Sequence, residues 1–175
     1  MTTQEAQPIA HGVEADVIVR EIEKLGITHI ISVPDTFQKT LISKLQERSS
    51  PKFMIACTED EAMGINAGLY MGGQKPMLLI QNNGVYASIN TLKAIALDAK
   101  VPTFMLVGQY QRDVTKPMEE NRSRAVRMLE PTLQTWGVPT FRLEGPQDVG
   151  NIAKAYQRAQ EDQGPTALIV GAPTA

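Results

Sequence analysis

A chain of 175 residues is long enough to bury a hydrophobic core and has the usual size of one domain. Its net charge of −2 gives no basic surface for nucleic acid or an anionic membrane, and no apolar run approaches the roughly 20 residues that span a bilayer. The single cysteine cannot form an internal disulfide, and the two histidines lack metal-ligand spacing. We therefore expect a cytoplasmic protein with no metal site of its own.

Helical and strand patterns alternate along the chain with short breaks between them. Residues 1–11 lack the features of a signal peptide, and we expect them to form a flexible N-terminal lead-in. Apolar residues at helical spacing predict helices, and short apolar runs predict strands. The predicted helices cover 13–25, 37–45, 59–72, 85–98, 119–136 and 147–162, with Pro131 expected to kink or divide the fifth. The predicted strands cover 28–34, 52–58, 76–82, 101–108, 139–143 and 166–171.

Continuous apolar strands that alternate with helices indicate a parallel sheet covered on both faces. The expected fold is α/β: a doubly wound, mainly parallel six-stranded sheet with helices on both faces, in one domain over residues 12–175. In such folds ligands bind beyond the carboxyl ends of the strands. The polar segments SVPDT, CTEDE, QNNG and GQYQRD stand at four such ends and are the places where we expect a site.

The segment TEDEAMGINAGLYMGG, residues 58–73, begins with three acids and contains four glycines. Thr58 is a good N-cap, and Glu61 at the third helical position completes the T-x-x-E pattern of a capping box. The glycines have no such explanation, because each glycine inside a helix costs about 1 kcal/mol relative to alanine. Gly64, Gly68 and Gly72 are spaced to line one helix face, which predicts the close approach of another helix or of a ligand.

Motifs for several common chemistries are absent from the sequence. No G-x-G-x-x-G follows a strand, and there is no P-loop and no G-x-S-x-G nucleophile elbow. Cys57 at a strand end has the position of a nucleophile, but we expect it to be a small buried hydrophobic residue. The glycine stripe that runs back from a carboxylate at the carboxyl end of the second strand instead suggests an interface with a catalytic acid at its edge.

The segment TEDEAMGINAGLYMGG resembles the glutamate helix of the pyrimidine-binding domain of thiamine diphosphate-dependent enzymes. In that family a glutamate ends the second strand, and Gly68 lies nine residues after Glu59, the spacing associated with that glutamate. The segments GITHIISVPDTFQKTLI, KPMLLIQNNGVYASINTLKAI and VPTFMLVGQYQRD are similar to the corresponding strands and turns of sulfopyruvate and phosphonopyruvate decarboxylases. The resemblance covers most of the chain and implies a flavodoxin-like pyrimidine-binding domain.

The resemblance implies that Glu59 is catalytic and binds the cofactor. A carboxylate bonded to N1′ of the pyrimidine favours the imino tautomer that removes the C2 proton. For Glu59 the alternative is a solvated acid in the first helical turn. The segment QNNG offers amides to the cofactor or substrate, with an Asx turn as the alternative. The cofactor-binding residues implied besides Glu59 are Pro34, Gln81, Asn82 and Asn83.

The resemblance also suggests residues that bind the substrate. Related pyruvate decarboxylases have an aspartate directly before a phenylalanine, whereas here Thr36 separates Asp35 from Phe37; the V-P-D-S pattern of phosphonopyruvate-type enzymes fits better. Cationic side chains would bind a second acidic group of the substrate. The candidates are Asp35, Thr36, Lys39, Lys93 and Arg112, and for the three cations the alternative is a solvated surface charge.

These enzymes hold the diphosphate and Mg²⁺ in a second domain with a G-D-G…N motif, which this chain lacks. The resemblance therefore implies an alpha subunit that shares its site with a beta subunit, through alpha–beta and alpha–alpha contacts. The expected activity is decarboxylation of a small anionic 2-oxo acid such as sulfopyruvate or phosphonopyruvate. Two alternatives remain: a two-chain carboligase or other 2-oxo acid-cleaving enzyme, and a non-catalytic flavodoxin-like binding or regulatory module.

Overall fold

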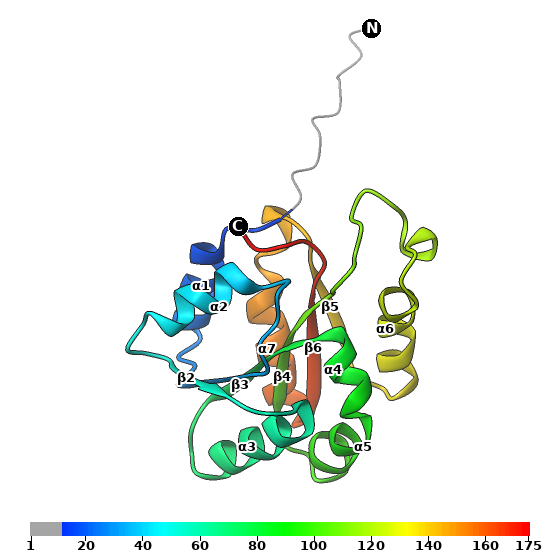
Figure 1. The fold of residues 1–175 in the computed structure, drawn as a ribbon. Helices are drawn as coiled ribbons and strands as arrows, with labels where there is room; N and C mark the ends of the chain where they lie inside the picture. The colour runs from blue at the N-terminus through cyan, green and yellow to red at the C-terminus, as the bar shows by residue number, and fades with distance from the viewer. Residues whose placement is uncertain (1–11) are drawn as a thin grey trace, which may run out of the picture.

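A six-stranded sheet runs through the centre of the computed structural model, which describes residues 12–175 (Figure 1). Every strand is parallel to its neighbours, in the order β2-β1-β3-β4-β6-β5. The prediction of a mainly parallel six-stranded sheet is confirmed, and the predicted lead-in lies outside the described residues. The strands are β1 (His29–Ser32), β2 (Lys52–Ile55), β3 (Pro76–Gln81), β4 (Thr103–Gly108), β5 (Thr140–Leu143) and β6 (Pro165–Val170).

Helices connect successive strands and cover both faces of the sheet (Figure 1). One hydrophobic cluster packs α1, α2 and α7 against one face, and a second packs α3, α4, η1 and α6 against the other. The α-helices are α1 (Ala15–Lys24), α2 (Lys39–Gln46), α3 (Glu59–Met71), α4 (Asn82–Ala87), α5 (Ile89–Thr91), α6 (Arg124–Thr135) and α7 (Asn151–Asp162). The other helical turns are the π-helical η1 (Leu92–Asp98) and the 3₁₀ turns η2 (Met118–Glu120) and η3 (Pro146–Asp148).

The strand sequences explain why helices pack on both faces of the sheet. Alternate residues of β3 enter opposite clusters, Met77 and Leu79 on one face and Leu78 and Ile80 on the other, and all four are fully buried. Strands β4 and β6 are buried along their whole length, whereas edge strand β2 is partly exposed. Central strands of a doubly wound sheet need apolar residues at consecutive positions, which is the pattern that the sequence shows.

The direction of winding changes between β1 and β3. From β1 the chain proceeds to β2 at one edge, and from β3 it proceeds to β4 and then to β5 and β6 at the other edge. Ligands in open α/β sheets bind at such a switch point, beyond the carboxyl ends of the strands. Asp35 follows β1 and Gln81 ends β3, so both stand at this point.

Three predicted helices differ from the structure at their boundaries. The helix predicted over 85–98 begins at Asn82, directly after β3, and is divided into α4, α5 and η1. The helices predicted to begin at 119 and 147 begin as the 3₁₀ turns η2 and η3, before α6 and α7. Pro131 lies inside α6 without dividing it, because the fully buried Leu129 and Leu133 hold both sides of the proline against the sheet. Of the helices within residues 12–175, none has both the length and the apolar character needed to cross a membrane.

Candidate functional site

Two of the three acids at the start of α3 take part in helix capping. The Glu61 N–H donates to Thr58 Oγ1 at 3.4 Å, and Glu61 Oε2 accepts the Cys57 N–H at 2.7 Å. The Thr58 hydroxyl is also the main reason that the pKa of Asp60 lies below its usual value. The expected capping box is present in a shifted form, because Glu61 binds the N–H of the residue before the cap. Cys57 is exposed, so the expectation that it is buried was wrong.

Glu59, the third of these acids, lies against Gly84 of the next crossover. It is half-buried, and its carboxyl group occupies the space that a Cβ at position 84 would fill. Gly84 is a buried residue in the first turn of α4, directly after β3. Only glycine at position 84 leaves room for this side chain, so the ends of β2 and β3 together fix the position of the Glu59 carboxylate.

Asp35 is the centre of a hydrogen-bond network at the switch point. It is 4% exposed, and its carboxylate accepts the Phe37 N–H at 2.9 Å, Gln81 Nε2 at 2.8 Å and Gln38 Nε2 at 3.4 Å. A Cβ at Gly108, the last residue of β4, would overlap Asp35 Oδ2. The strand ends of β1, β3 and β4 therefore converge on one buried carboxylate that is stabilised by N–H donors.

The amides of the QNNG segment extend this network toward the surface. Gln81 donates to Asp35 and accepts from Asn83 Nδ2 at 2.9 Å, and Asn83 is exposed. Asn82 is fully buried and donates to the Tyr110 carbonyl oxygen at 3.3 Å, which ties the end of β3 to the loop after β4. Asn82 Oδ1 also accepts the Asn83 N–H at 3.0 Å, so a local turn contact and the longer-range bonds coexist.

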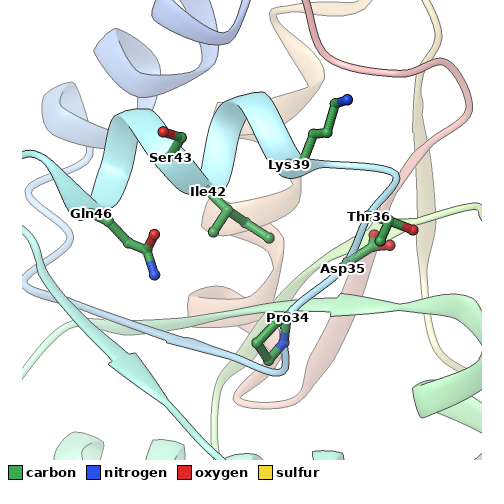
Figure 2. Close-up of a pocket in the computed structure, with 7 residues that line it drawn as sticks. All are labelled: Pro34, Asp35, Thr36, Lys39, Ile42, Ser43 and Gln46. Carbon is green, nitrogen blue, oxygen red and sulfur yellow. The ribbon is translucent and has the colours of Figure 1, made fainter.

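A cavity of about 240 Å³ opens beside Asp35, between the loop after β1 and helix α2 (Figure 2). Asp35 forms part of its buried wall, while Pro34, Thr36 and Lys39 are exposed. The structure therefore brings four of the predicted site residues together around one cavity. Its lining residues are Pro34, Asp35, Thr36, Lys39, Ile42, Ser43 and Gln46.

The other two predicted cations lie elsewhere and have internal partners. The Arg112 side chain is 5% exposed; its Nη2 lies 3.3 Å from Glu144 Oε1, and its Nη1 donates to the Lys116 carbonyl oxygen at 2.9 Å. Lys93 lies on η1, where its Nζ is 3.1 Å from Asp98 Oδ2 in an exposed ion pair. Arg112 is thus used to hold the loop after β4, and neither cation lines the cavity beside Asp35.

Three residues around the Asp35 and Glu59 carboxylates were not recognised in the sequence: Gln38, Gly84 and Gly108. Gln38 is fully buried and contacts both the Asp35 carboxylate and the Ile80 carbonyl oxygen, each at 3.4 Å. A polar residue in helical register with the apolar Leu41 and Leu45 was an available signal for Gln38. The two glycines gave no such signal, because their neighbours come from distant parts of the chain.

The glycine face of α3, defined by Gly64, Gly68 and Gly72, is exposed. A Cβ added at Gly64 or Gly68 would meet no atom within 4 Å, and at Gly72 it would meet only backbone oxygens of α3 itself. The close approach that the sequence predicts for this face therefore does not occur within residues 12–175. Across the same residues, no group of three or more His, Cys, Asp or Glu side chains could hold a metal ion.

A family model described as "Thiamine pyrophosphate enzyme, N-terminal TPP binding domain" matches residues 14–133. The chain belongs to this family. The resemblance that the sequence shows in its glutamate helix is confirmed. Within this thiamine pyrophosphate enzyme domain, the match includes the Asp35 network, Glu59 with Gly84, and helix α6 up to Leu133.

Two relatives match the chain over most of its length. The sulfopyruvate decarboxylase subunit alpha of Methanocaldococcus jannaschii is 28% identical over 78% of this chain and 80% of its own. The subunit of the same name from Methanococcus maripaludis is 25% identical over 90% of this chain and 94% of its own. The thiamine pyrophosphate enzyme domain described above is therefore a homologue of these alpha subunits along nearly their full length.

A solved structure confirms the fold. Benzoylformate decarboxylase from Polynucleobacter necessarius superposes with a TM-score of 0.70 at 23% identity, covering 91% of this chain. The chain spans 30% of the length of that protein. At this identity the similarity establishes the α/β architecture of the thiamine pyrophosphate enzyme domain and carries no statement about substrate.

Proposed function

We propose that this chain is the alpha subunit of a two-chain, thiamine diphosphate-dependent decarboxylase. Its substrate would be a small anionic 2-oxo acid of the sulfopyruvate or phosphonopyruvate kind, converted to an aldehyde and CO₂. The family match and the two alpha-subunit relatives support the cofactor and the two-chain organisation. The observation that carries the catalytic assignment is the packing of the Glu59 carboxyl group against Gly84, at the carboxyl-end edge of the sheet.

The residues at the ends of β2 and β3 fit the pyrimidine half of the cofactor. Gly84 removes a side chain where Glu59 needs space, and the capping contacts of α3 are made by Asp60 and Glu61. Glu59 would hold a proton at N1′ of the aminopyrimidine, and a carboxyl group suits this task because it can both donate and accept. When bound, thiamine diphosphate supplies the nucleophilic carbon and the electron sink for decarboxylation.

Around Glu59, the polar residues at the strand ends would orient the cofactor and the substrate. In this proposal Pro34, Asn82 and Asn83 contact the cofactor, and Gln81 is aligned by its bond to Asp35. Asp35, Thr36 and Lys39 line the cavity in Figure 2. In this proposal these three residues contact the substrate. Asp35 is preorganised for such a role because its three N–H partners come from the surrounding backbone and amides.

The remaining half of the site would come from a beta subunit that holds the diphosphate and Mg²⁺. Residues 12–175 would then act as the pyrimidine-binding domain. The exposed glycine face of α3 would be part of the subunit contact, because small residues allow a partner helix to approach closely.

Reconstitution with the beta chain tests this function. The purified alpha chain is combined with the beta chain, and CO₂ release from sulfopyruvate is measured with and without thiamine diphosphate and Mg²⁺. We expect release only when both chains and the cofactor are present. Glu59→Gln should reduce turnover by about 100-fold or more while assembly, followed by gel filtration, stays intact.

Matched controls make the result specific. Asp60→Asn changes a neighbouring acid whose role lies in capping α3, and it should leave turnover within a few-fold of the unmodified complex. Full activity in Glu59→Gln would remove Glu59 from its proposed role. Absence of CO₂ release from every 2-oxo acid tested, in an assembled complex, would refute the decarboxylase assignment itself.

A further inference from the structure

A second cavity, of about 580 Å³, lies beyond the end of β4 and is lined by two arginines. Its walls come from the loop that follows β4 and from the start of α6. The lining residues are Gln111, Arg122, Ser123 and Arg124. Arg124 also lines a cavity of about 290 Å³ with Tyr86, Ala125 and Met128, so the two cavities share this residue.

This cavity adjoins the carboxyl edge that holds Glu59 and Asp35. Asn82, two residues before Gly84, binds the carbonyl oxygen of Tyr110, the residue next to Gln111 of the cavity wall. The Tyr86 hydroxyl of α4 donates to the Ala125 carbonyl oxygen of α6 at 2.9 Å, and the two helices lie side by side in Figure 1. Helix α4, whose first turn contains Gly84, is therefore also bonded to the residue next to Arg124.

The two arginines have no acidic partner within the described residues. The ion pairs formed within residues 12–175 use Arg48, Arg112, Arg142 and Arg158 and include neither Arg122 nor Arg124. Glu119, an acid on the preceding turn, lines a different cavity with Arg142. Two guanidinium groups without internal carboxylates, placed on one cavity, leave a local excess of positive charge there.

The loop that presents Arg122 is held by internal hydrogen bonds. Asn121 is 1% exposed, and its side chain accepts the Asp113 N–H at 2.8 Å and donates to the Pro117 carbonyl oxygen at 2.9 Å. Arg127 Nη1 donates to the Arg122 carbonyl oxygen at 2.9 Å. The backbone on both sides of Arg122 is therefore fixed before any ligand arrives, which lowers the ordering cost of binding.

We propose that Arg122 and Arg124 bind the second acidic group of the substrate, a sulfonate or phosphonate carried on a 2-oxo acid. This inference rests on the proposed function. It assigns to these two residues the role that the sequence had suggested for Lys39, Lys93 and Arg112. Of these three, Lys93 and Arg112 have internal partners. Guanidinium groups suit this ligand because their fixed N–H pairs match the spacing of oxygens on a tetrahedral anion. Pyruvate, which lacks the second anion, gains nothing from the pair.

A binding titration tests the assignment without turnover. The full-length, ¹⁵N-labelled chain is titrated with 3-sulfopropanoate, which has the carbon chain of sulfopyruvate without the keto group, and with propanoate as the monoanion. We expect saturable shifts of the backbone amides of residues 122–124 with 3-sulfopropanoate only. The variants Arg122→Gln and Arg124→Gln should each weaken this binding by roughly 10- to 100-fold, the value of one charge-assisted contact.

Arg20→Gln is the matched control, because Arg20 is an exposed arginine on α1 that lines neither arginine cavity. It should bind 3-sulfopropanoate like the unmodified chain. Unchanged binding in the Arg122→Gln, Arg124→Gln double variant would overturn the proposal, as would shifts that spread over the whole chain without saturating. Equal binding of propanoate and 3-sulfopropanoate would also overturn it.

A second measurement in the assembled complex separates this inference from the proposed function. The ratio of kcat/KM for sulfopyruvate to kcat/KM for pyruvate should fall roughly 10- to 100-fold in each arginine variant, with the loss confined to the dianion. An equal loss for both substrates would contradict a role in selectivity. If the unmodified complex decarboxylates neither substrate, the proposed function fails, and the titration still decides whether this cavity binds the anion.

Discussion

The carboxyl group of Glu59 lies where the side chain of residue 84 would be, and Gly84 leaves that space open. The two residues are on different crossovers, one at the start of α3 and the other in the first turn of α4. Through this contact, the segments that follow β2 and β3 together fix the position of the Glu59 carboxyl group. A change at position 84 therefore acts on Glu59 without altering the acid itself.

Gly84→Ala is expected to displace Glu59 and to reduce decarboxylation by roughly 100-fold, close to the effect of Glu59→Gln. Overpacking at this buried position should also cost about 1–3 kcal/mol of stability. Steady-state kinetics of the complex and thermal unfolding of the chain measure the two effects. Gly150→Ala is the control, because a Cβ there meets no atom within 4 Å. Full turnover in Gly84→Ala would show that the contact does not position the acid.

Thr58→Ala should destabilise the chain by about 1 kcal/mol at neutral pH, because α3 loses its N-cap. The Thr58 hydroxyl also lowers the pKa of Asp60 from its ordinary value of 3.8. A lowered folded pKa stabilises the protein above pH 3.8, and this contribution is lost as pH falls through the folded value. The difference between the two proteins should therefore shrink in acid. Denaturant unfolding at about pH 7 and about pH 3, with an NMR titration of Asp60, tests both statements; a difference that grows in acid would contradict them.

The sequence alone predicted the sheet better than the helix boundaries. Buried strands such as β3 and β4 are continuous apolar runs, and their pattern depends on neighbours within the same strand. Helix starts depend on more distant contacts. Helix α4 begins at Asn82, whose side chain binds the Tyr110 carbonyl oxygen 28 residues later. Helix α6 continues through Pro131 because the surrounding leucines are buried against the sheet. Local helix propensity does not account for such tertiary packing.

For the site, the sequence identified the acids and missed what surrounds them. Glu59 and Asp35 stand at strand ends, which are the places where this fold class binds its ligands. The packing of Asp35 against Gly108 joins residues far apart in the chain and is visible only in three dimensions. Arg112 has the charge expected of a residue that binds an anionic substrate, but its guanidinium group forms an ion pair with Glu144. The sequence shows the sign of each side-chain charge, whereas the ion-pair partner of that side chain depends on the fold.

Asp35→Asn should destabilise the chain by about 2 kcal/mol, because the new amide group meets the N–H donors of Phe37, Gln38 and Gln81. Gln81→Glu alone should also destabilise it, by placing a second carboxylate beside Asp35. In the double variant the new amide at position 35 can donate to the new carboxylate at position 81, so it should be more stable than the two single changes predict. A double-mutant cycle by urea unfolding measures this coupling. Simple additivity would show that positions 35 and 81 are not energetically coupled, contrary to the expectation from their hydrogen bond.

Arg112→Ala should reduce stability by about 3 kcal/mol, because it leaves Glu144 without its partner and frees the loop backbone at Lys116. Substrate selectivity of the assembled complex should not change, in contrast to Arg122→Gln. Lys93→Ala is the control for stability: its ion pair with Asp98 is exposed, and its loss should cost less than about 1 kcal/mol. A selective loss of sulfopyruvate turnover in Arg112→Ala, with stability intact, would return Arg112 to the substrate site.

The glycine face of α3 predicts opposite effects on the isolated chain and on the complex. Gly68→Ala should stabilise the isolated chain by up to about 1 kcal/mol, because no atom lies within 4 Å of the added group and alanine favours the helix. Gly68→Leu should also leave the isolated chain folded but should weaken association with the beta chain at least tenfold, since its bulk separates the two surfaces. Thermal unfolding and analytical ultracentrifugation measure the two properties. Undiminished association of Gly68→Leu would place the subunit contact on another surface, and the glycines would then need a different explanation.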